Sequence, residues 1–249
     1  MFSLQNKVAI VTGANTGLGQ GMAIGLAKAG ADIALVGISK PTETIAQIKA
    51  LGRKCVSIDA NLLSIEPIET IIEQVISHFG GFDILVNNAG IIRREDSLDF
   101  SEKDWDDVMN INIKVPMFLS QAAARHWVKE NKKGKIINIA SMLSFQGGIR
   151  VPSYTSSKSA VMGLTRALAN EWAKYNINVN AIAPGYMATD NTQALRADKA
   201  RSAEILNRIP QGRWGEPKDL AGPIVFLASE ASDYVNGYTI AVDGGWLAR

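Results

Sequence analysis

The sequence predicts an α/β protein in which a seven-stranded, doubly wound parallel sheet carries helices on both faces. Short β-branched or apolar runs alternate with amphipathic stretches along the whole chain, and most of these runs are apolar throughout, as in strands buried on both faces. No internal repeat and no linker-like change of composition divides the 249 residues. We therefore expect residues 1–249 to form a single domain.

Each expected element follows from its local pattern. β-branched and apolar residues bounded by glycine, proline or polar turns predict strands at 7–13, 31–37, 54–59, 82–90, 134–141, 177–185 and 238–245. Apolar residues at three- and four-residue steps predict helices at 19–29, 43–51, 65–79, 105–129 and 153–174. Ser153, which follows a proline, is the expected N-cap of the last helix.

One connection, residues 186–217, breaks this rhythm because it is long, polar and rich in arginine. Connections of that length in a compact domain often serve as lids or binding loops. The connection begins where a strand ends, which is where open α/β sheets bind their ligands. We expect residues 186–217 to cover a substrate.

Composition argues against several classes of function. The chain is 47% hydrophobic and 20% charged, and its net charge of +2 comes from interspersed residues, so we expect neither a nucleic-acid nor a membrane partner. The single cysteine and the N-terminus without a signal-like segment predict a cytoplasmic protein. No CxxC or HExxH pattern is present, so we expect no metal site and a surface position for His78 and His126.

Tyr154 and Lys158 lie four residues apart at the start of the expected helix at 153–174 and so share one helical face. A neighbouring ammonium favours a phenolate, and the pKa of such a tyrosine can fall from about 10 toward neutrality. The pair predicts a proton-transferring tyrosine. An inward-packed aromatic beside a solvated lysine would give the same pattern.

The first strand runs into the loop Thr12-Gly13-Ala14-Asn15-Thr16-Gly17-Leu18-Gly19 and then into a helix. Glycines there let the backbone approach a phosphate, and the helix N-terminus favours negative charge. The loop could instead serve only tight packing of strand and helix. The second strand ends without the acidic residue that binds a ribose 2′-hydroxyl; Ser39 is a possible hydroxyl partner and Lys40 weakly favours a 2′-phosphate.

Taken together, these motifs resemble the short-chain dehydrogenase/reductase family. The resemblance covers nearly the whole chain and rests on residues 12–19, on Asn87-Asn88-Ala89-Gly90, and on Asn112, Ser141, Tyr154, Lys158 and Pro184-Gly185. It implies a Rossmann fold and hydride transfer between a nicotinamide cofactor and a CH–OH group. It favours NAD without excluding NADP.

The resemblance also implies roles for individual residues. Tyr154 would be the general acid or base, Lys158 would lower its pKa and bind the nicotinamide ribose, and Ser141 would hydrogen-bond the substrate oxygen. Asn112 would hold a water that passes protons to the lysine, although a buried asparagine bonded to its own helix is the alternative. The implied cofactor-binding residues are Gly13, Asn15, Thr16, Gly17, Leu18, Gly19, Ser39, Asn61, Leu62, Asn88, Ala89, Gly90, Tyr154, Lys158, Pro184, Gly185, Met187 and Thr189. Asn61 stands where the family often has an aspartate that contacts adenine.

Within the family, residues 92–110, 141–159, 183–193 and 235–249 resemble dehydrogenases of keto-deoxy sugar acids in pectin and uronate breakdown. A sugar acid needs a cation in the pocket, and a guanidinium can bind a carboxylate at two points. Arg150 or Arg93 is expected to read the carboxylate, and Gln146 and Ser141 are further substrate-binding candidates.

Two other functions stay open. The first is a reductase of the same family that acts on a 3-oxoacyl thioester or a polyol, and the second is a non-catalytic dinucleotide sensor. The expected helices at 105–129 and 153–174 carry more apolar positions than one sheet face can cover. Because family members pair these helices across subunits, we expect a homotetramer.

Overall fold

The computed structural model describes residues 1–249 and contains one seven-stranded, entirely parallel sheet. Its strands are β1 (Val8–Thr12), β2 (Asp32–Gly37), β3 (Cys55–Asp59), β4 (Ile84–Asn87), β5 (Gly134–Ile139), β6 (Ile177–Pro184) and β7 (Thr239–Val242). They lie in the order β3-β2-β1-β4-β5-β6-β7. The order reverses direction between β1 and β4, so the carboxyl ends of these strands border the crevice that such sheets use for ligands.

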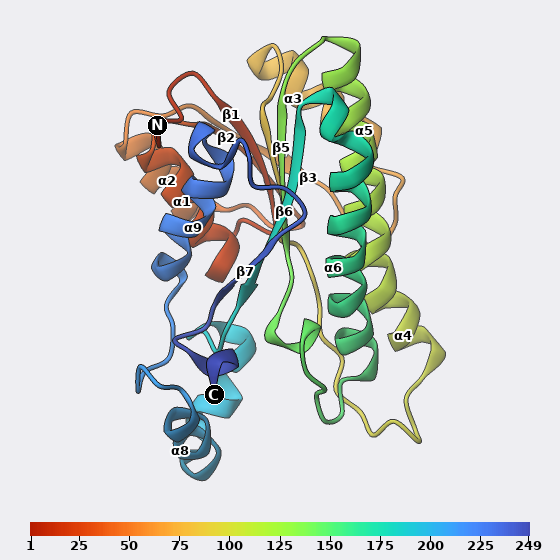
Figure 1. The fold of residues 1–249 in the computed structure, drawn as a ribbon, viewed down its shortest axis with the longest axis vertical. Coiled ribbons are helices and arrows are strands. Elements are labelled where there is room, and N and C mark those ends of the chain that lie inside the picture. Colours follow the sequence, from red (N-terminus) through yellow and green to blue (C-terminus); the bar gives the residue numbers. More distant parts are fainter.

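Helices cover both faces of the sheet (Figure 1). They are α1 (Gly17–Lys28), α2 (Thr42–Ala50), α3 (Ile68–Phe79), α4 (Glu102–Met109), α5 (Val115–Lys129), α6 (Pro152–Trp172), α7 (Gln193–Ala197), α8 (Lys199–Arg208) and α9 (Ala221–Ala228). Side chains of α3, α5 and α6 form one buried cluster with the sheet, and side chains of α1, α2 and α9 form a second on the opposite face. This arrangement confirms the predicted fold class.

The expected helix at 105–129 is interrupted. A π-helical turn, Asn110–Lys114, separates α4 from α5 and places Asn112 in the interior, where it is 1% exposed. Pro116 follows this turn inside a continuous helical run, where its missing N–H removes a hydrogen bond to the preceding turn. Single π-turns inside α-helices often occur at functional sites.

Ser153 is not the N-cap of the helix that carries Tyr154. That helix, α6, begins at Pro152, with Val151 as its N-cap, because the fixed φ of proline suits the first helical position. Ser153 is fully buried inside the first turn, and its Oγ has no hydrogen-bond partner. The prediction was therefore wrong by two residues.

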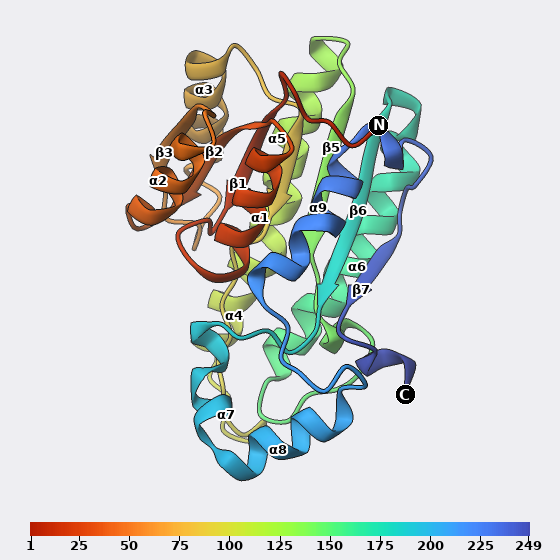
Figure 2. The same ribbon diagram turned by 90° about the vertical axis from the view of Figure 1, so that its left-hand side faces the viewer.

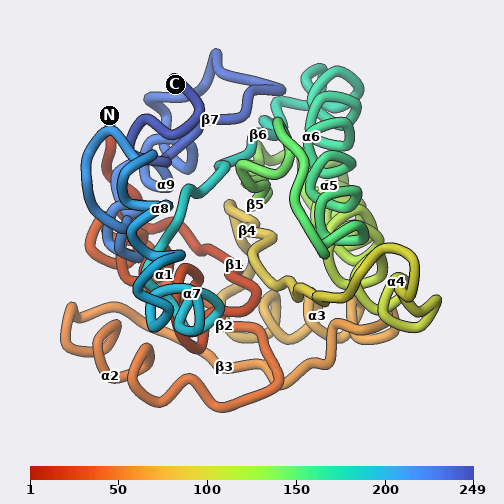
Figure 3. Tube along the Cα trace, turned by 90° about the horizontal axis from the view of Figure 1, so that it is seen from below, coloured from red at the N-terminus to blue at the C-terminus, as the bar shows by residue number.

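Residues 186–217, named here the cover segment, contain α7 and α8. They lie below the carboxyl ends of the strands, as Figures 2 and 3 show from two directions. The segment is anchored at its two ends by a β-bridge between Met187 and Gly215. None of the helices is both long and apolar enough to cross a membrane.

Candidate functional site

The glycine loop between β1 and α1 has the geometry of a phosphate-binding turn. Gly13 and Gly17 have φ values of +65° and +58°, which favour glycine. A Cβ on Gly19 would overlap the Gly13 carbonyl and the Asn88 amide. Asn88 Nδ2 donates to the carbonyls of Thr12 at 2.9 Å and Gly13 at 3.1 Å, so the loop is held from β4.

The ends of β2 and β3 close one side of this crevice. The Asn15 amide contacts the Ser39 hydroxyl, and the backbone N–H of Ala60 donates to Gly37 at 3.0 Å. The Asn61 Oδ1 accepts from the backbone N–H of Leu63 at 3.1 Å. The NH2 group of Asn61 is therefore the part of this side chain that could contact a ligand. Leu62 as a whole is buried, 2% exposed, and its side chain packs in the core cluster of the α3 side of the sheet.

The residues after β6 reach the same crevice from the other side. A Cβ on Gly17 would lie 3.5 Å from Thr189 Cγ2, so the glycine loop and the cover segment are neighbours. Gly185 follows Pro184 at the end of β6, where a Cβ would lie 2.5 Å from the Asp243 backbone. The Met187 side chain is buried, 4% exposed, and packs into the core behind this wall.

Three of the four predicted catalytic side chains, Ser141, Tyr154 and Lys158, meet in front of this crevice. Ser141 follows β5, and its Oγ accepts a hydrogen bond of 3.2 Å from the backbone of Leu143. This leaves the Ser141 proton free to donate, and the Ser141 hydroxyl lies close enough to Tyr154 to lower the pKa of the phenol. Lys158, one turn after Tyr154, places Nζ 5.6 Å from the centre of the tyrosine ring.

The environment shifts both titrating groups away from their ordinary values. Burial raises the pKa of Tyr154, while the Ser141 hydroxyl and the charge of Arg94 lower it in part. Burial lowers the pKa of Lys158 to about 8, since its only hydrogen-bond partner is the Ile139 carbonyl at 2.7 Å. The pKa of Tyr154 is therefore raised and not brought toward neutrality, because desolvation outweighs the effects of Ser141 and Arg94.

Asn112 uses its side chain to tie three segments together. Its Oδ1 accepts from the backbone of Ile91 at 2.9 Å, and its Nδ2 donates to the Ile91 carbonyl at 3.0 Å and to Ser157 Oγ at 3.1 Å. A Cβ on Gly90 would lie 3.0 Å from Asn112 Oδ1 and 3.7 Å from Lys158 Nζ. Both N–H groups of the Asn112 amide are already donated to protein acceptors. If Asn112 holds a water for Lys158, it does so through another atom.

Two of the expected carboxylate-binding candidates already have acidic partners. Arg93 Nε lies 3.2 Å from Asp104, and Arg150 Nη2 lies 3.2 Å from Glu95. Arg94, by contrast, forms no salt bridge, and its positive charge acts on the Tyr154 hydroxyl. Sequence reasoning passed over Arg94 in favour of Arg93. Adjacent residues in an extended segment point to opposite sides, so the sequence already indicated that only one of Arg93 and Arg94 could face the site.

Histidines take no part in the site. His78 is exposed, as expected, whereas His126 is half-buried and stacks on Phe82 at a ring distance of 5.1 Å. The expected surface position of His126 is therefore wrong, because α5 turns this residue toward the aromatic packing at the start of β4. Burial also lowers the pKa of His126.

The crevice suits a dinucleotide. Three features lie along the crevice between β2 and β6. They are the tight glycine turn at the N-terminus of α1, the Ser39 hydroxyl after β2, and the buried ammonium of Lys158. Cβ atoms at Gly13 or Gly19 would close the cradle against Asn88 and Ala89. These are the features that let a backbone approach a pyrophosphate.

Known proteins resemble this chain over its full length. The sequence pattern of the family described as enoyl-(acyl carrier protein) reductase matches residues 13–247. A 2-dehydro-3-deoxy-D-gluconate 5-dehydrogenase of Escherichia coli (strain K12) is 71% identical over 248 residues, which cover 100% of this chain and 98% of the relative. The protein of the same name from Dickeya dadantii (strain 3937) is 69% identical with the same coverage. A crystal structure from Agrobacterium tumefaciens with bound NADP, described as that of a 2-deoxy-D-gluconate 3-dehydrogenase, gives a TM-score of 0.94 at 54% identity and covers 100% of this chain and 99% of that chain.

Proposed function

This chain belongs to the short-chain dehydrogenase/reductase family, and we propose that it is a 2-dehydro-3-deoxy-D-gluconate 5-dehydrogenase, which transfers a hydride between a nicotinamide cofactor and a keto-deoxy sugar acid. The observation that carries the proposal is the meeting of Ser141, Tyr154 and Lys158 in front of a glycine cradle. This arrangement supports proton-transfer chemistry at the nicotinamide end of a bound dinucleotide. The substrate class rests on the relatives.

Tyr154 carries out the proton transfer. In reduction its phenol gives a proton to the carbonyl oxygen, and in oxidation the phenolate takes the proton of the hydroxyl. The Ser141 hydroxyl, whose oxygen already accepts from Leu143, donates to the same substrate oxygen and stabilises charge on it. The nicotinamide, when bound, supplies or accepts the hydride.

Lys158 holds a positive charge beside the tyrosine. Its Nζ is buried with one protein acceptor, the Ile139 carbonyl, so two of its three donors are available to ligand hydroxyls. The charge favours the phenolate, and a polar ligand that replaces part of the lost solvation would keep the lysine protonated. Asn112 positions this arrangement by holding Ile91 and Ser157.

We propose NAD as the preferred cofactor, although NADP is the form bound in the Agrobacterium structure. The end of β2 carries no arginine to hold a 2′-phosphate, and Lys40 is the cation there. Asp59 lies beside Gly37 in the register of β2 and β3 and adds a carboxylate at this corner. A carboxylate repels a phosphate, which supports NAD.

We propose that Arg94 binds the substrate carboxylate. A guanidinium without an acidic partner, close enough to act on the Tyr154 hydroxyl, fits an acid whose carboxylate lies a few bonds from the reacting carbon. Its contact with the Asn191 carbonyl, at 3.5 Å, also connects it to the cover segment. Arg93 and Arg150 would first have to leave their carboxylate partners.

The decisive experiment follows the absorbance of the reduced nicotinamide with 2-dehydro-3-deoxy-D-gluconate, with NAD and NADP in parallel. The Tyr154→Phe variant is the control, because it keeps the ring and removes only the proton donor. Turnover by the wild type that is lost in Tyr154→Phe is the expected result. Cofactor binding without turnover of this acid would contradict the proposal.

The second candidate is reduction of a 3-oxoacyl thioester, which the description of the matching family keeps open. An acetoacetyl thioester tested in the same assay separates the two. A polyol oxidation is separated in the same way. A sensor without catalysis would bind the dinucleotide and turn over none of these substrates.

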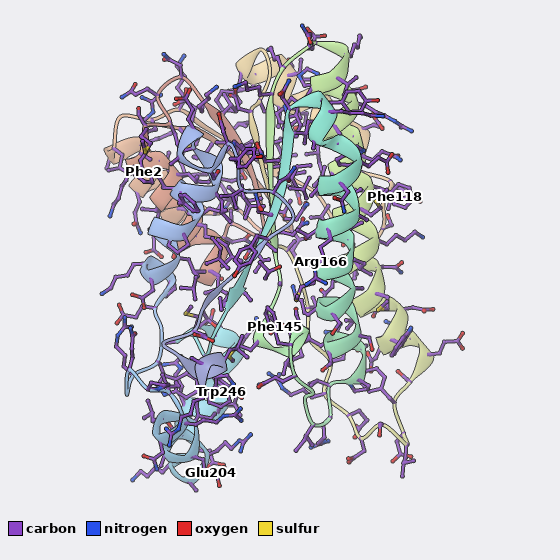
Figure 4. All side chains as sticks on the ribbon, in the orientation of Figure 1. Phe2, Phe118, Phe145, Arg166, Glu204 and Trp246 are labelled. Atoms are coloured by element: carbon purple, nitrogen blue, oxygen red, sulfur yellow. The ribbon has the colours of Figure 1, made fainter.

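We further propose a cytoplasmic homotetramer that acts in pectin breakdown. Phe118 on α5 and Trp105 on α4 are 36% and 38% exposed, and Phe118 lies on the outer side of the helical layer (Figure 4). Such large apolar side chains support a helix-to-helix subunit contact. Light scattering at micromolar concentration tests this, and a monomeric mass would contradict it.

A further inference from the structure

A small buried cluster joins the cover segment to the catalytic turn. Its four members are Met142, Ile205, Ile209 and Trp246, each at most 5% exposed. Met142 directly follows Ser141, Ile205 belongs to α8, Ile209 follows that helix, and Trp246 lies near the C-terminus. In Figure 4, Trp246 lies between the end of β7 and α8. Three distant parts of the sequence are thus packed beside the reacting groups.

Gln146 lies at the polar edge of this cluster and accepts two hydrogen bonds on one atom. Its Oε1 accepts from Trp246 Nε1 at 3.3 Å and from Arg208 Nη2 at 3.4 Å. The Arg208 guanidinium lies 4.0 Å from the centre of the Trp246 ring, so the two donors also form a cation–π interaction with each other. Arg208 forms no salt bridge.

These contacts decide the orientation of the Gln146 carboxamide. A reversed amide would place its NH2 group against two donors, neither of which can accept a hydrogen bond. The orientation that satisfies both donors leaves the NH2 group with no hydrogen bond inside the protein. Gln146 comes only five residues after Ser141 and eight before Tyr154, in the segment that connects these two residues.

We propose that Arg208 and Trp246 are positioning residues that hold the Gln146 NH2 group toward the substrate, so that the enzyme selects ligands with an oxygen acceptor at that point. This inference rests on the proposed function and deepens it. The acceptor is an oxygen of the substrate carboxylate, which has lone pairs for this amide as well as for Arg94; a hydroxyl could donate to a glutamate and would not distinguish the two residues. A substrate with a methylene there leaves the amide unpaired.

Two substitutions separate this role from a purely structural one. Gln146→Glu keeps the acceptor oxygen for Arg208 and Trp246 and loses both donors. Gln146→Met keeps a similar length and loses donors and acceptor. If Gln146 only holds the cover segment in place, the glutamate variant is harmless and the methionine variant is harmful. If Gln146 donates to the substrate, both variants are harmful and the glutamate variant is the worse.

The measurement is kcat and KM for 2-dehydro-3-deoxy-D-gluconate. We expect KM to rise by about 10-fold or more in both Gln146 variants, with kcat changed by less than about 3-fold. Arg208→Ala, which frees the amide to turn, should raise KM, and Arg208→Lys should recover part of the loss. An unchanged KM in Gln146→Glu would overturn the positioning and leave the proposed function intact.

A second readout does not depend on the substrate. Because a glutamate accepts from both donors and pairs with Arg208, the melting temperature of Gln146→Glu should equal or exceed that of the wild type, and that of Gln146→Met should fall. A lower melting temperature in Gln146→Glu would overturn the assigned orientation. If the wild type is inactive on the sugar acid, the proposed function fails, and this comparison still decides the orientation.

Discussion

Replacing Lys158 with methionine should abolish turnover and at the same time make the folded protein more stable. Lys158 is 5% exposed, and burial lowers its pKa from 10.5 to about 8. A depression of that size corresponds to roughly 3 kcal/mol of unfavourable charge burial below pH 8. Methionine has a similar shape and no charge. Loss of the hydrogen bond to the Ile139 carbonyl offsets about 1 kcal/mol.

The net gain in the free energy of unfolding at pH 7 is therefore about 2 kcal/mol, or roughly 4–8 °C in melting temperature for a domain of this size. The effect depends on pH with a definite sign. Between about pH 8 and 10.5 the unfolded lysine binds a proton that the folded lysine has lost, so the wild type gains stability as the pH rises. The variant lacks this gain, so the difference shrinks through this window, and near pH 10.5 the lost hydrogen bond leaves the wild type slightly the more stable protein.

Thermal unfolding of both proteins at fixed concentration, at pH 7, 9 and 10.5, measures this difference. Lys54→Met is the matched control, because Lys54 is an exposed lysine whose loss removes the same charge from the surface. A lower melting temperature for Lys158→Met at pH 7 would refute the reasoning. A difference that stays constant across the pH range would refute it equally.

Three further substitutions test the rest of the site. Gly19→Ala introduces a Cβ against the Gly13 carbonyl and Asn88, so we expect about 1–3 kcal/mol of destabilisation in urea unfolding and weaker NAD binding in a fluorescence titration. Gly222→Ala in α9, where a Cβ meets nothing within 4 Å, should leave NAD binding unchanged and should not destabilise the protein, because alanine favours a helix. Arg94→Gln should raise KM for the sugar acid by about 10-fold or more, whereas Arg196→Gln in the cover segment should not; equal effects would argue against a specific carboxylate contact. Asp59→Asn should raise kcat/KM with NADP relative to NAD by about 3-fold or more, and an unchanged ratio would remove Asp59 from the choice of cofactor.

The strands and the glycine loop could be predicted because local patterns determine them. The run Val8–Thr12 is apolar on both sides up to its last residue, and only a sheet covered on two faces can bury both sides at once. The order of the motifs along the chain then identified the family. The start of α6 was misplaced because the fixed φ of Pro152 determines it more strongly than the capping preference of Ser153.

The sequence by itself predicted the fold class and the glycine loop, since strand periodicity and turn residues act over short distances, and the family resemblance added Ser141, Tyr154 and Lys158 as catalytic candidates. The tertiary structure decided which charges are available. Arg93 and Arg150 meet carboxylates from Asp104 and Glu95, partners that no local pattern reveals, and this leaves Arg94 free. It also decided the direction of each pKa, because desolvation depends on everything packed around Tyr154 and Lys158 and not on their spacing.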